Sequence, residues 1–396
     1  MKFAQNLIQS IYLFYKFPFK LNLYYEISNK FFLKNFKISS KTTIFNLKND
    51  IASAIQFSSN EPCEDNFTLK NFNKNSKILL FSIFDGHGGS LLSEYANNYT
   101  KNFFSTIFNS KYFNNNNNNN KKFEESIVYL LKYALKNIEK NYYSICYEKY
   151  LNKKGREYSI GTCALVGLLF SNKLFVANLG DSKGRLFSLN NNNNYFVTKL
   201  NDVHNARKMK EKNYLENKFF FDKKIIVCKN KKTCYVKGRL QCTRSLGDFY
   251  LKFKEFNSHV QTKENKNYFK KEIKNFEGPY IQNEPDIKIF DINNNNNNNN
   301  NDNNNDKFII FGSDGLWDYL KSREIGKKIK KIEKENVNNI SQRINNKLIE
   351  IILNKVSVQN NIKIKDLLEF NKGKKLRKIL DDTTIITINL TNFYKF

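Results

Sequence analysis

Four apolar segments of this chain each have an aspartate at one end, on a tight or glycine-containing turn. Short apolar runs bounded by turn residues are typical of buried strands. The four aspartates are Asp85, Asp181, Asp314 and Asp381. Carboxylates that meet at one end of a sheet repel one another, so a fold gathers them in order to hold a divalent cation. If the four ends converge, the pattern predicts strands that carry a metal site with oxygen ligands.

The clearest of these segments is FSIFDGHGGS, residues 81–90. Asp85 is a candidate ligand, since hard divalent cations bind carboxylate oxygen. Gly86 would let its backbone carbonyl approach an ion, and His87 can titrate near neutral pH. Taken alone, an ordinary strand-to-helix turn with Asp85 as the helix cap explains the stretch equally well. The other acidic positions favour the metal site.

Two further carboxylates, Glu64 and Asp65, lie about twenty residues before Asp85. An adjacent acidic pair is most often a surface feature. Here it immediately precedes an alternating segment, and it could be the contribution of the neighbouring strand to the same site.

Asparagine runs interrupt the chain and shorten its globular part. Of the 396 residues, 40% are hydrophobic, which is enough for a sizeable core. The runs cannot build a core, and they are best explained as solvated loop insertions. We expect one domain, residues 51–396, with insertions near 114–120, 190–194 and 293–305.

The net charge of +29 would normally favour a nucleic-acid or membrane-surface partner. The lysines are spread along the chain, however, and no zinc-finger spacing or RNA-binding aromatic motif accompanies them. We therefore expect most lysines to be solvated surface residues, with no dedicated nucleic-acid binding. A basic nucleic-acid binder is the hypothesis that the charge alone would favour.

The first 50 residues are basic and acid-poor, with eight lysines and only two acidic residues, Glu26 and Asp50. Lysines at 16 and 20 interrupt the apolar run before it reaches the roughly 18 residues of a membrane span, so we expect no transmembrane segment. The stretch is equally well explained as an organelle-targeting segment or as an N-terminal extension.

Cysteine and histidine usage argues against crosslinks and zinc. The six cysteines include no C-x-x-C pair, and several lie in apolar runs, which indicates reduced, buried thiols and a non-secretory compartment. With only three histidines, a His/Cys zinc site is not expected.

Hydrophobic spacing predicts the remaining elements. Helices are expected over 91–109, 123–151 and, as one long amphipathic helix, 325–353. Residues 163–170 and 173–182 predict a hairpin with a two-residue turn. A helix is expected within 204–216, and an edge strand within 279–290, where two prolines stand. A strand is expected over 308–313, followed by a helix that places Asp314 and Asp318 on one face. A last strand is expected within 381–390.

Six motifs in sequence order give this pattern a precedent: EDNF, FDGHGG, GTCA with ANLGDS, TRSLGD, SDGLWD and DDTT. Between about residues 60 and 390 the chain closely resembles the metal-dependent protein phosphatase (PPM, type 2C) family. NEPCED at 60–65, HNA at 204–206 and PYIQNEPDI at 279–287 resemble the pyruvate dehydrogenase phosphatase-like subgroup. The resemblance implies an α+β fold, a four-layer α/β/β/α sandwich of two antiparallel sheets flanked by helices.

The resemblance also implies two core Mg²⁺ or Mn²⁺ ions. Asp85 would bridge them, and Asp314 and Asp381 would complete the first site. Glu64, largely through water, and the Gly86 carbonyl would serve the second site.

A weaker third ion is implied as well, held by Asp181 and Asp318 together with Asp314. Asp65 would lie behind the ligands. His87 matches the proposed general acid of the family, which protonates the leaving serine or threonine oxygen. The implied reaction is direct attack of a metal-bridging hydroxide on phosphorus, without a phosphoenzyme.

Three positions depart from the usual family pattern. Asn60 stands where many members have an arginine that grips the substrate phosphate, so the residue that binds phosphate here is unknown. Asp382 stands where asparagine is usual, and Lys183 replaces a common arginine. Cys63, beside the acidic pair, needs no nucleophilic role.

The sequence thus predicts a monomeric Mg²⁺- or Mn²⁺-dependent phosphatase that acts on phosphoserine and phosphothreonine in proteins. The alternative is a catalytically weak family member that binds phosphoproteins as a scaffold, which Asn60 and the insertions suggest. We expect an intracellular location. The basic leader and the subgroup likeness favour the mitochondrion, and the cytoplasm and nucleus are alternatives.

Overall fold

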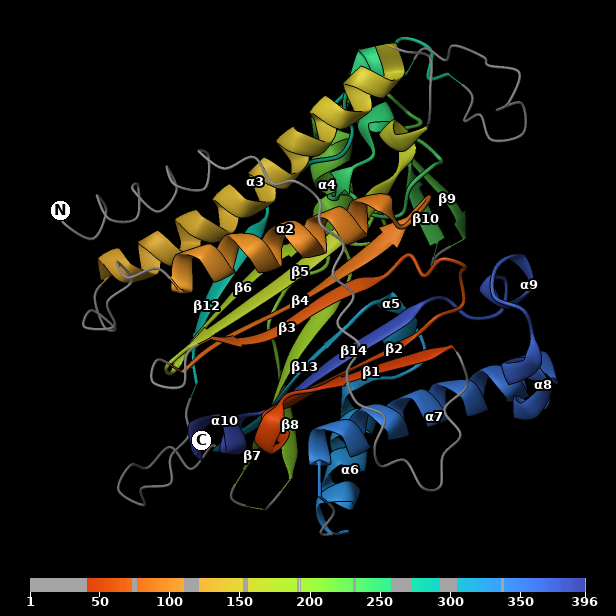
Figure 1. Cartoon of the computed structure of the whole chain (residues 1–396). Coiled ribbons are helices and arrows are strands. Elements are labelled where there is room, and N and C mark those ends of the chain that lie inside the picture. Colours follow the sequence, from red (N-terminus) through yellow and green to blue (C-terminus); the bar gives the residue numbers. More distant parts are fainter. Residues whose placement is uncertain are drawn as a thin grey trace.

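Two six-stranded antiparallel sheets form the centre of the molecule (Figure 1). The computed structural model describes residues 41–72, 77–109, 121–151, 156–190, 192, 194–230, 233–257, 272–292, 305–335 and 338–395. The first sheet has, in order, β1 (Thr42–Asn46), β2 (Ala52–Phe57), β14 (Thr383–Asn389), β13 (Asn305–Gly312), β7 (Lys183–Leu189) and β8 (Tyr195–Lys199). The second has β12 (Asp286–Asp291), β6 (Lys173–Leu179), β5 (Gly161–Phe170), β4 (Ile78–His87) and β3 (Asn66–Phe72), with β11 (Leu246–Gly247) pairing with β5.

Helices cover the outer face of each sheet, as Figure 1 shows. On the second sheet lie α2 (Leu91–Phe108) and α3 (Lys121–Leu151), with α2 packed on β3 and β4. On the first lie α6 (Ser322–Glu333), which contacts β8, and α7 (Ile340–Asn360), which contacts β2 and β14. The predicted four-layer α/β/β/α sandwich is confirmed.

The apolar core is divided among these layers. One buried cluster lies between the sheets, where the rings of Phe81 and Phe311 meet edge to face with centroids 4.7 Å apart. Two more clusters join each sheet to its own helices. Trp317, the only tryptophan of the chain, is buried in one of these.

Two boundaries differ from the sequence predictions. The prediction of a single helix over 325–353 is wrong, because α6 and α7 are separate helices. Asn339, which precedes α7, has a left-handed backbone with φ of 59°. The break lets each helix follow a different part of the sheet. Residues 42–46, placed in the N-terminal extension by the sequence, form β1 and pair with β2. The sheet therefore begins inside the predicted extension.

Other predictions on local structure are confirmed. Ser171 and Asn172 connect β5 to β6 as a two-residue turn. Strand β12 lies at the edge of its sheet. The insertion at 190–194 connects β7 to β8, and the Asn190 amide donates to the Asn194 carbonyl at 3.1 Å. The insertion at 114–120 and all of 293–305 except Asn305 lie outside the described residues.

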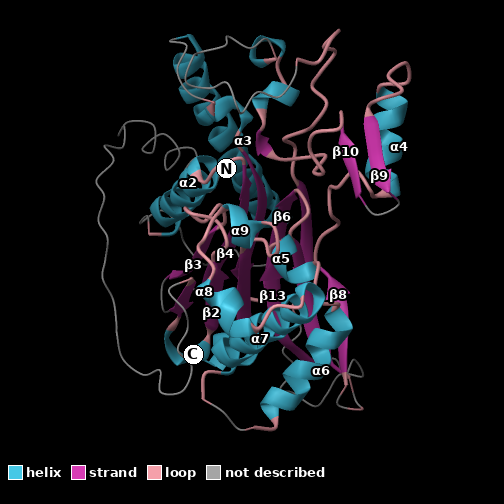
Figure 2. Ribbon diagram, turned by 90° about the vertical axis from the view of Figure 1, so that its right-hand side faces the viewer, coloured by secondary structure: helices cyan, strands magenta, loops and turns pink. Residues whose placement is uncertain are grey.

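A small lobe projects from one side of the layered body (Figure 2). It contains α4 (Met209–Lys218), β9 (Ile226–Asn230) and β10 (Thr233–Val236), and it has its own apolar cluster. Cys228 and Cys234 form a disulfide across the β9–β10 hairpin, so the expectation of reduced thiols is wrong for this pair. The antiparallel register places the two cysteines opposite each other, which their sequence spacing does not reveal.

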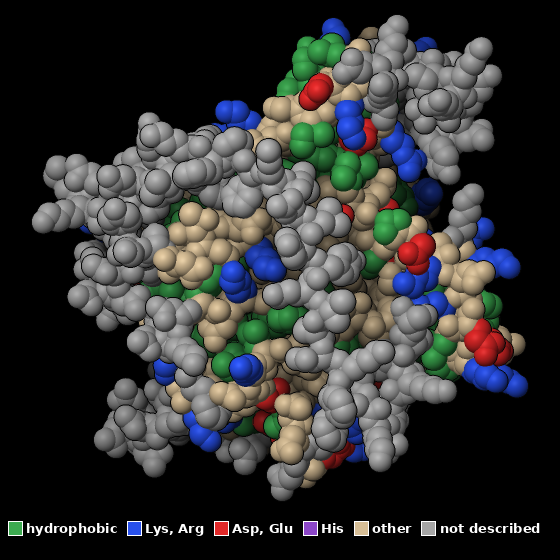
Figure 3. Space-filling view, viewed as in Figure 1, with side chains coloured by type: hydrophobic (Ala, Val, Ile, Leu, Met, Phe, Trp, Pro, Cys, Tyr) green, Lys and Arg blue, Asp and Glu red, His purple; other side chains and the backbone are tan. Residues whose placement is uncertain are grey.

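The remaining helices are short: α5 (Asp314–Trp317), α8 (Ile364–Glu369), α9 (Lys374–Arg377) and α10 (Leu390–Lys395). Among the described residues, no helix is both long and apolar enough to cross a membrane. On the face in Figure 3, the visible Lys and Arg side chains lie in several separate groups with other side chains between them. That distribution agrees with the prediction that most lysines are solvated surface residues.

Candidate metal centre

Strand ends from both sheets bring three aspartates together. Asp85 lies near the end of β4, Asp181 follows β6, and Asp314 follows β13 and begins α5. One carboxylate oxygen from each lies within 4.8 Å of those of the other two. The Asp314 amide also donates to Asp85 Oδ2 at 3.4 Å. The convergence that the sequence analysis assumed is confirmed for these three.

Burial and mutual repulsion raise the pKa values of several carboxyl groups at this site. Burial, with the neighbouring Asp314 next in importance, raises the pKa of Asp85 well above its ordinary value. Burial raises the pKa of Asp314 to about 7, with a further contribution from Asp181. Burial and then Asp382 raise the pKa of Asp65 to about 8. Oxygen-only donors that resist ionisation fit a hard divalent cation, because the cation would offset their mutual repulsion.

The loop between β2 and β3 carries the acidic pair and is anchored by Asp382. This buried carboxylate accepts from the amides of Ser59 at 2.6 Å, Asn60 at 2.9 Å and Glu64 at 2.8 Å. Asn60 Nδ2 donates to the same carboxylate at 2.9 Å. Asp65, behind the loop, accepts from Thr384 Oγ1 at 2.8 Å. One side chain, just before β14, thus fixes the loop that presents Glu64.

Gly86 is required by close backbone packing. A Cβ atom at this position would lie 2.3 Å from the Glu64 carbonyl oxygen. Ser93 from α2 donates its hydroxyl to the same carbonyl at 2.5 Å. The end of β4 therefore packs against the backbone of the acidic loop, and any side chain at residue 86 would separate them.

His87 is held by an aspartate to which the sequence analysis gave no role. His87 Nε2 lies 2.7 Å from Asp248 Oδ2, and Ser245 Oγ donates to the same oxygen at 2.7 Å. Asp248 is buried and has a left-handed backbone with φ of 50°. A Cβ on Gly161 would lie 2.0 Å from the Asp248 carboxylate, so that glycine makes room for the pair. The only available signal was the place of Asp248 in TRSLGD.

Asp181 also has supports that the sequence analysis missed. Asn205 Nδ2 donates to Asp181 Oδ2 at 2.7 Å. The buried His204 accepts at Nδ1 from the Gly180 amide at 3.2 Å, and its Nε2 lies 3.0 Å from Asp286. The HNA stretch, quoted only as a mark of a subgroup, therefore fixes the turn that carries Asp181.

Comparison with known proteins identifies the family. Residues 55–361 match the model of the family described as Protein phosphatase 2C. The chain belongs to the protein phosphatase 2C family. By family it is a protein serine/threonine phosphatase, which agrees with the six motifs.

Relatives in plants match at modest identity. Probable protein phosphatase 2C 72 of Oryza sativa is 26% identical over 321 residues, 81% of this chain and 72% of that protein. Probable protein phosphatase 2C 38 of Arabidopsis thaliana is 27% identical over 325 residues, 81% of this chain and 74% of that protein. Probable protein phosphatase 2C 48 of Arabidopsis thaliana is 31% identical over 238 residues, 59% and 56% of the two chains.

Solved structures support the fold. A serine-threonine phosphatase 2C from Toxoplasma gondii has a TM-score of 0.55 at 17% identity, covering 88% of this chain and 98% of that one. A C. elegans sex determining protein has a TM-score of 0.53 at 16% identity, covering 87% and 66%.

Other predicted ligands of this phosphatase 2C chain lie outside the three-aspartate group. Asp318 is exposed at the end of α5, and Asp381 contacts Arg377 of α9. Neither belongs to the three-aspartate group. Burial raises the pKa of Glu64, whereas the charge of Arg377 lowers it. The metal-binding roles of these residues stay predictions.

Cys63 gives no sign of a nucleophilic role. Burial, followed by the charges of Asp65 and Asp382, raises the pKa of its thiol far above the ordinary value. A thiol that stays protonated is a poor nucleophile. This agrees with the sequence analysis, which gave Cys63 no part in the chemistry.

Proposed function

We propose that this chain hydrolyses phosphoserine and phosphothreonine in proteins with the help of Mg²⁺ or Mn²⁺. The single observation that carries the proposal is the group of Asp85, Asp181 and Asp314, whose oxygens lie within 4.8 Å of one another in a partly buried site. Membership of the phosphatase 2C family supports the same chemistry.

Asp85 and Asp314 would hold the ions at the core of the site, with Asp381 and the Glu64 loop on either side. Bound divalent ions would supply an activated water and offset the charge of the phosphate. The protein's part is to keep the carboxylates fixed, which the hydrogen bonds of Asp382 and the close packing at Gly86 accomplish.

His87 would deliver the proton that the leaving oxygen needs. His87 Nε2 lies 2.7 Å from the Asp248 carboxylate, which orients the imidazole ring. Asp248 is fully buried and does not face substrate, so it acts as a positioning residue. Serine and threonine are poor leaving groups, and a positioned acid lowers the barrier for their departure.

Arg377 is the residue that we propose for the substrate phosphate, in place of the arginine missing at Asn60. Its guanidinium contacts Asp381, and its positive charge opposes the burial that raises the pKa values of Asp314 and Glu64. Asn60, by contrast, is engaged with Glu64 and Asp382. A planar guanidinium suits phosphate oxygens because it can donate two parallel hydrogen bonds.

The decisive test is hydrolysis of a phosphothreonine peptide by the full chain with Mn²⁺, with Mg²⁺ and with EDTA. We expect metal-dependent phosphate release that falls at least ~100-fold in Asp314→Asn, because losing a metal ligand removes several kcal/mol of charge stabilisation. Exposed Asp366→Asn, on α8, is the matched control and keeps full activity. A folded, metal-loaded chain that releases no phosphate would favour the phosphoprotein-binding scaffold instead.

A further inference from the structure

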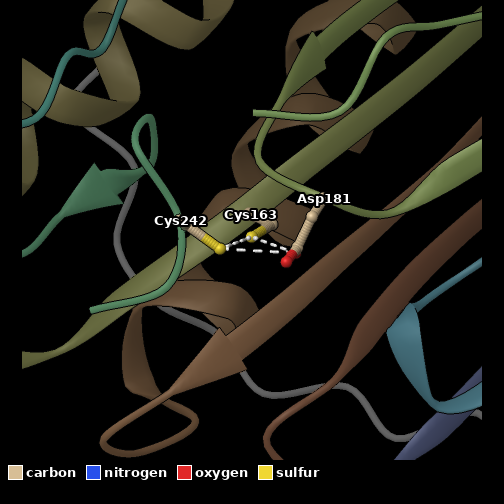
Figure 4. A group of neighbouring side chains, drawn as sticks. All are labelled: Cys163, Asp181 and Cys242. Atoms are coloured by element: carbon tan, nitrogen blue, oxygen red, sulfur yellow. Dashed lines mark hydrogen bonds between the residues drawn. The ribbon is translucent and has the colours of Figure 1, made fainter. Parts of the chain in front are cut away.

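Two thiols and a carboxylate converge beside the acidic cluster (Figure 4). Cys163 lies on β5, directly opposite Asp85 of β4, and Cys242 lies in the segment before β11. The two sulfurs are 3.4 Å apart. Asp181 Oδ1 is 3.5 Å from the Cys163 sulfur and 3.3 Å from the Cys242 sulfur. All three side chains point at one another, and one cation could contact all of them.

The spacing of the three atoms is close to one face of a tetrahedron. Zinc bonds to sulfur at about 2.3 Å and to carboxylate oxygen at about 2.0 Å, so tetrahedral ligands lie about 3.8 Å apart for two sulfurs and about 3.5 Å apart for sulfur and oxygen. The sulfur–oxygen distances of 3.5 and 3.3 Å already agree within about 0.2 Å. The sulfurs would separate by about 0.4 Å from their 3.4 Å spacing.

The surroundings orient the carboxylate toward the thiols. Asn205 Nδ2 donates to Asp181 Oδ2 at 2.7 Å, which leaves Oδ1 directed at the two sulfurs. Asn205 and Cys242 are themselves joined by a β-bridge, so one backbone segment places both. Metal ligands are commonly oriented by such an outer hydrogen bond.

Packing holds the two thiols in place and buries them from solvent. Cys163 is 2% exposed and Cys242 is 7% exposed. Cys163 also fills the space that a Cβ on Gly180 would need, 2.3 Å from its sulfur, so the Asp181 turn is packed on the thiol. The donor set differs from that of the aspartate cluster, because thiolate sulfur selects soft cations and carboxylate oxygen selects hard ones.

We propose that Cys163, Cys242 and Asp181 form a binding site for one thiophilic divalent cation, Zn²⁺ by its geometry. On binding, the two thiols release their protons to solvent, and the fourth position stays open to water. The small number of histidines does not oppose this site, since none is a ligand. Because Asp181 faces both this site and the aspartate cluster, the cation would compete for it and inhibit the enzyme; that consequence alone rests on the proposed phosphatase activity.

The test is titration of the metal-free, reduced full chain with Co²⁺ as a spectroscopic probe. Cys228→Ser/Cys234→Ser serves as the parent protein, because reduction would free those two thiols. We expect a thiolate-to-cobalt charge-transfer band that saturates at one equivalent and is displaced by Zn²⁺. The band should disappear in the parent protein with Cys163→Ser/Cys242→Ser, and it should persist with Cys63→Ser or Cys146→Ser.

No band in the parent protein, or an unchanged band without Cys163 and Cys242, would overturn the proposal. If the Cys163 and Cys242 variants fail to fold, X-ray absorption of the Zn²⁺-loaded parent protein decides the question without them. We expect two sulfur ligands at about 2.3 Å, and a shell of oxygen and nitrogen alone would refute the site.

Inhibition is measured separately from binding. With Mn²⁺ present, Cys163→Ser/Cys242→Ser should need at least ~10-fold more Zn²⁺ for half-inhibition than the parent protein, since losing even an outer partner of a ligand costs 10–100-fold in affinity. A chain without phosphatase activity that still shows the cobalt band would contradict the proposed function and leave the thiolate site standing.

Discussion

His87 is the single residue whose removal should change what the enzyme can cleave. We expect His87→Ala to lower kcat on a phosphoserine peptide by ~10²–10⁴-fold, because the leaving oxygen then lacks a proton donor. An aryl phosphate has a better leaving group and should lose much less. The measurement is kcat on both substrates at saturating Mn²⁺, and equal losses would argue against an acid role for His87.

Asp248→Asn separates positioning from chemistry at the same site. Asp248 holds His87 at 2.7 Å and lies behind it. Like His87→Ala, this variant should lose less kcat on the aryl phosphate than on the phosphoserine peptide. Its loss on the peptide should be smaller than that of His87→Ala, and its pH–rate profile should change. A variant that loses stability but keeps both the profile and the substrate ratio would show that Asp248 is only structural.

Arg377 should affect substrate binding more than turnover. Replacing it with alanine removes a charge-assisted contact at a partly exposed position, so we expect KM for a phosphopeptide to rise ~10-fold. Arg377→Lys should recover part of the loss. Lys375→Ala, an exposed residue in the same helix, is the matched control. An unchanged KM in Arg377→Ala, or an equal rise in Lys375→Ala, would contradict the proposal.

Among whole elements, β1 gives a direct test of where the folded domain begins. A chain lacking residues 1–50 loses β1, its pairing with β2, and the Lys41 ammonium that donates to the Leu368 carbonyl at 2.6 Å. A chain lacking residues 1–40 keeps all of these contacts. We expect the shorter chain to melt at least ~5 °C below the longer one, since several backbone hydrogen bonds are lost. Equal melting temperatures would show that β1 is dispensable.

For the molecule as a whole, the carboxylate cluster links stability to pH and to metal. The pKa of Asp314 is raised to about 7 and that of Asp65 to about 8, so between about pH 4 and 8 the folded state binds more protons than the unfolded state. The free energy of unfolding of the metal-free protein therefore falls as pH rises through this range. Divalent cations bind the ionised cluster, so their stabilisation grows with pH.

Thermal melts of the metal-free chain from pH 5 to 8, with and without Mn²⁺, measure this linkage. Asp314→Asn removes one titrating group, so its decline in melting temperature should be shallower than that of the wild type. Saturating Mn²⁺ should raise the melting temperature of the wild type most at pH 8. Parallel pH curves for wild type and Asp314→Asn would show that Asp314 titrates alike in the folded and unfolded states.

The motifs of the chain were enough to predict its family and, through the family resemblance, the layered fold. Alternation and apolar runs predict strands because side chains on a strand alternate between its two faces, and the order of the motifs identified the family around Asp85, Asp181 and Asp314. These patterns lie within short segments of the sequence, so they can be recognised before the fold is known. Hydrophobic spacing also predicted one helix over 325–353, because spacing alone cannot reveal that α6 and α7 pack on different strands.

Contacts between residues far apart in the sequence could not be predicted before the fold was known. Asp248 contacts His87 across 161 positions, and Cys242 contacts Cys163 across 79. Arg377, on a short helix before β14, contacts Asp381. Sheet register places Cys228 opposite Cys234 and so makes the disulfide that the sequence analysis did not expect. Such pairs depend on strand order and on the packing of two sheets. Neither is encoded in the spacing of any single segment.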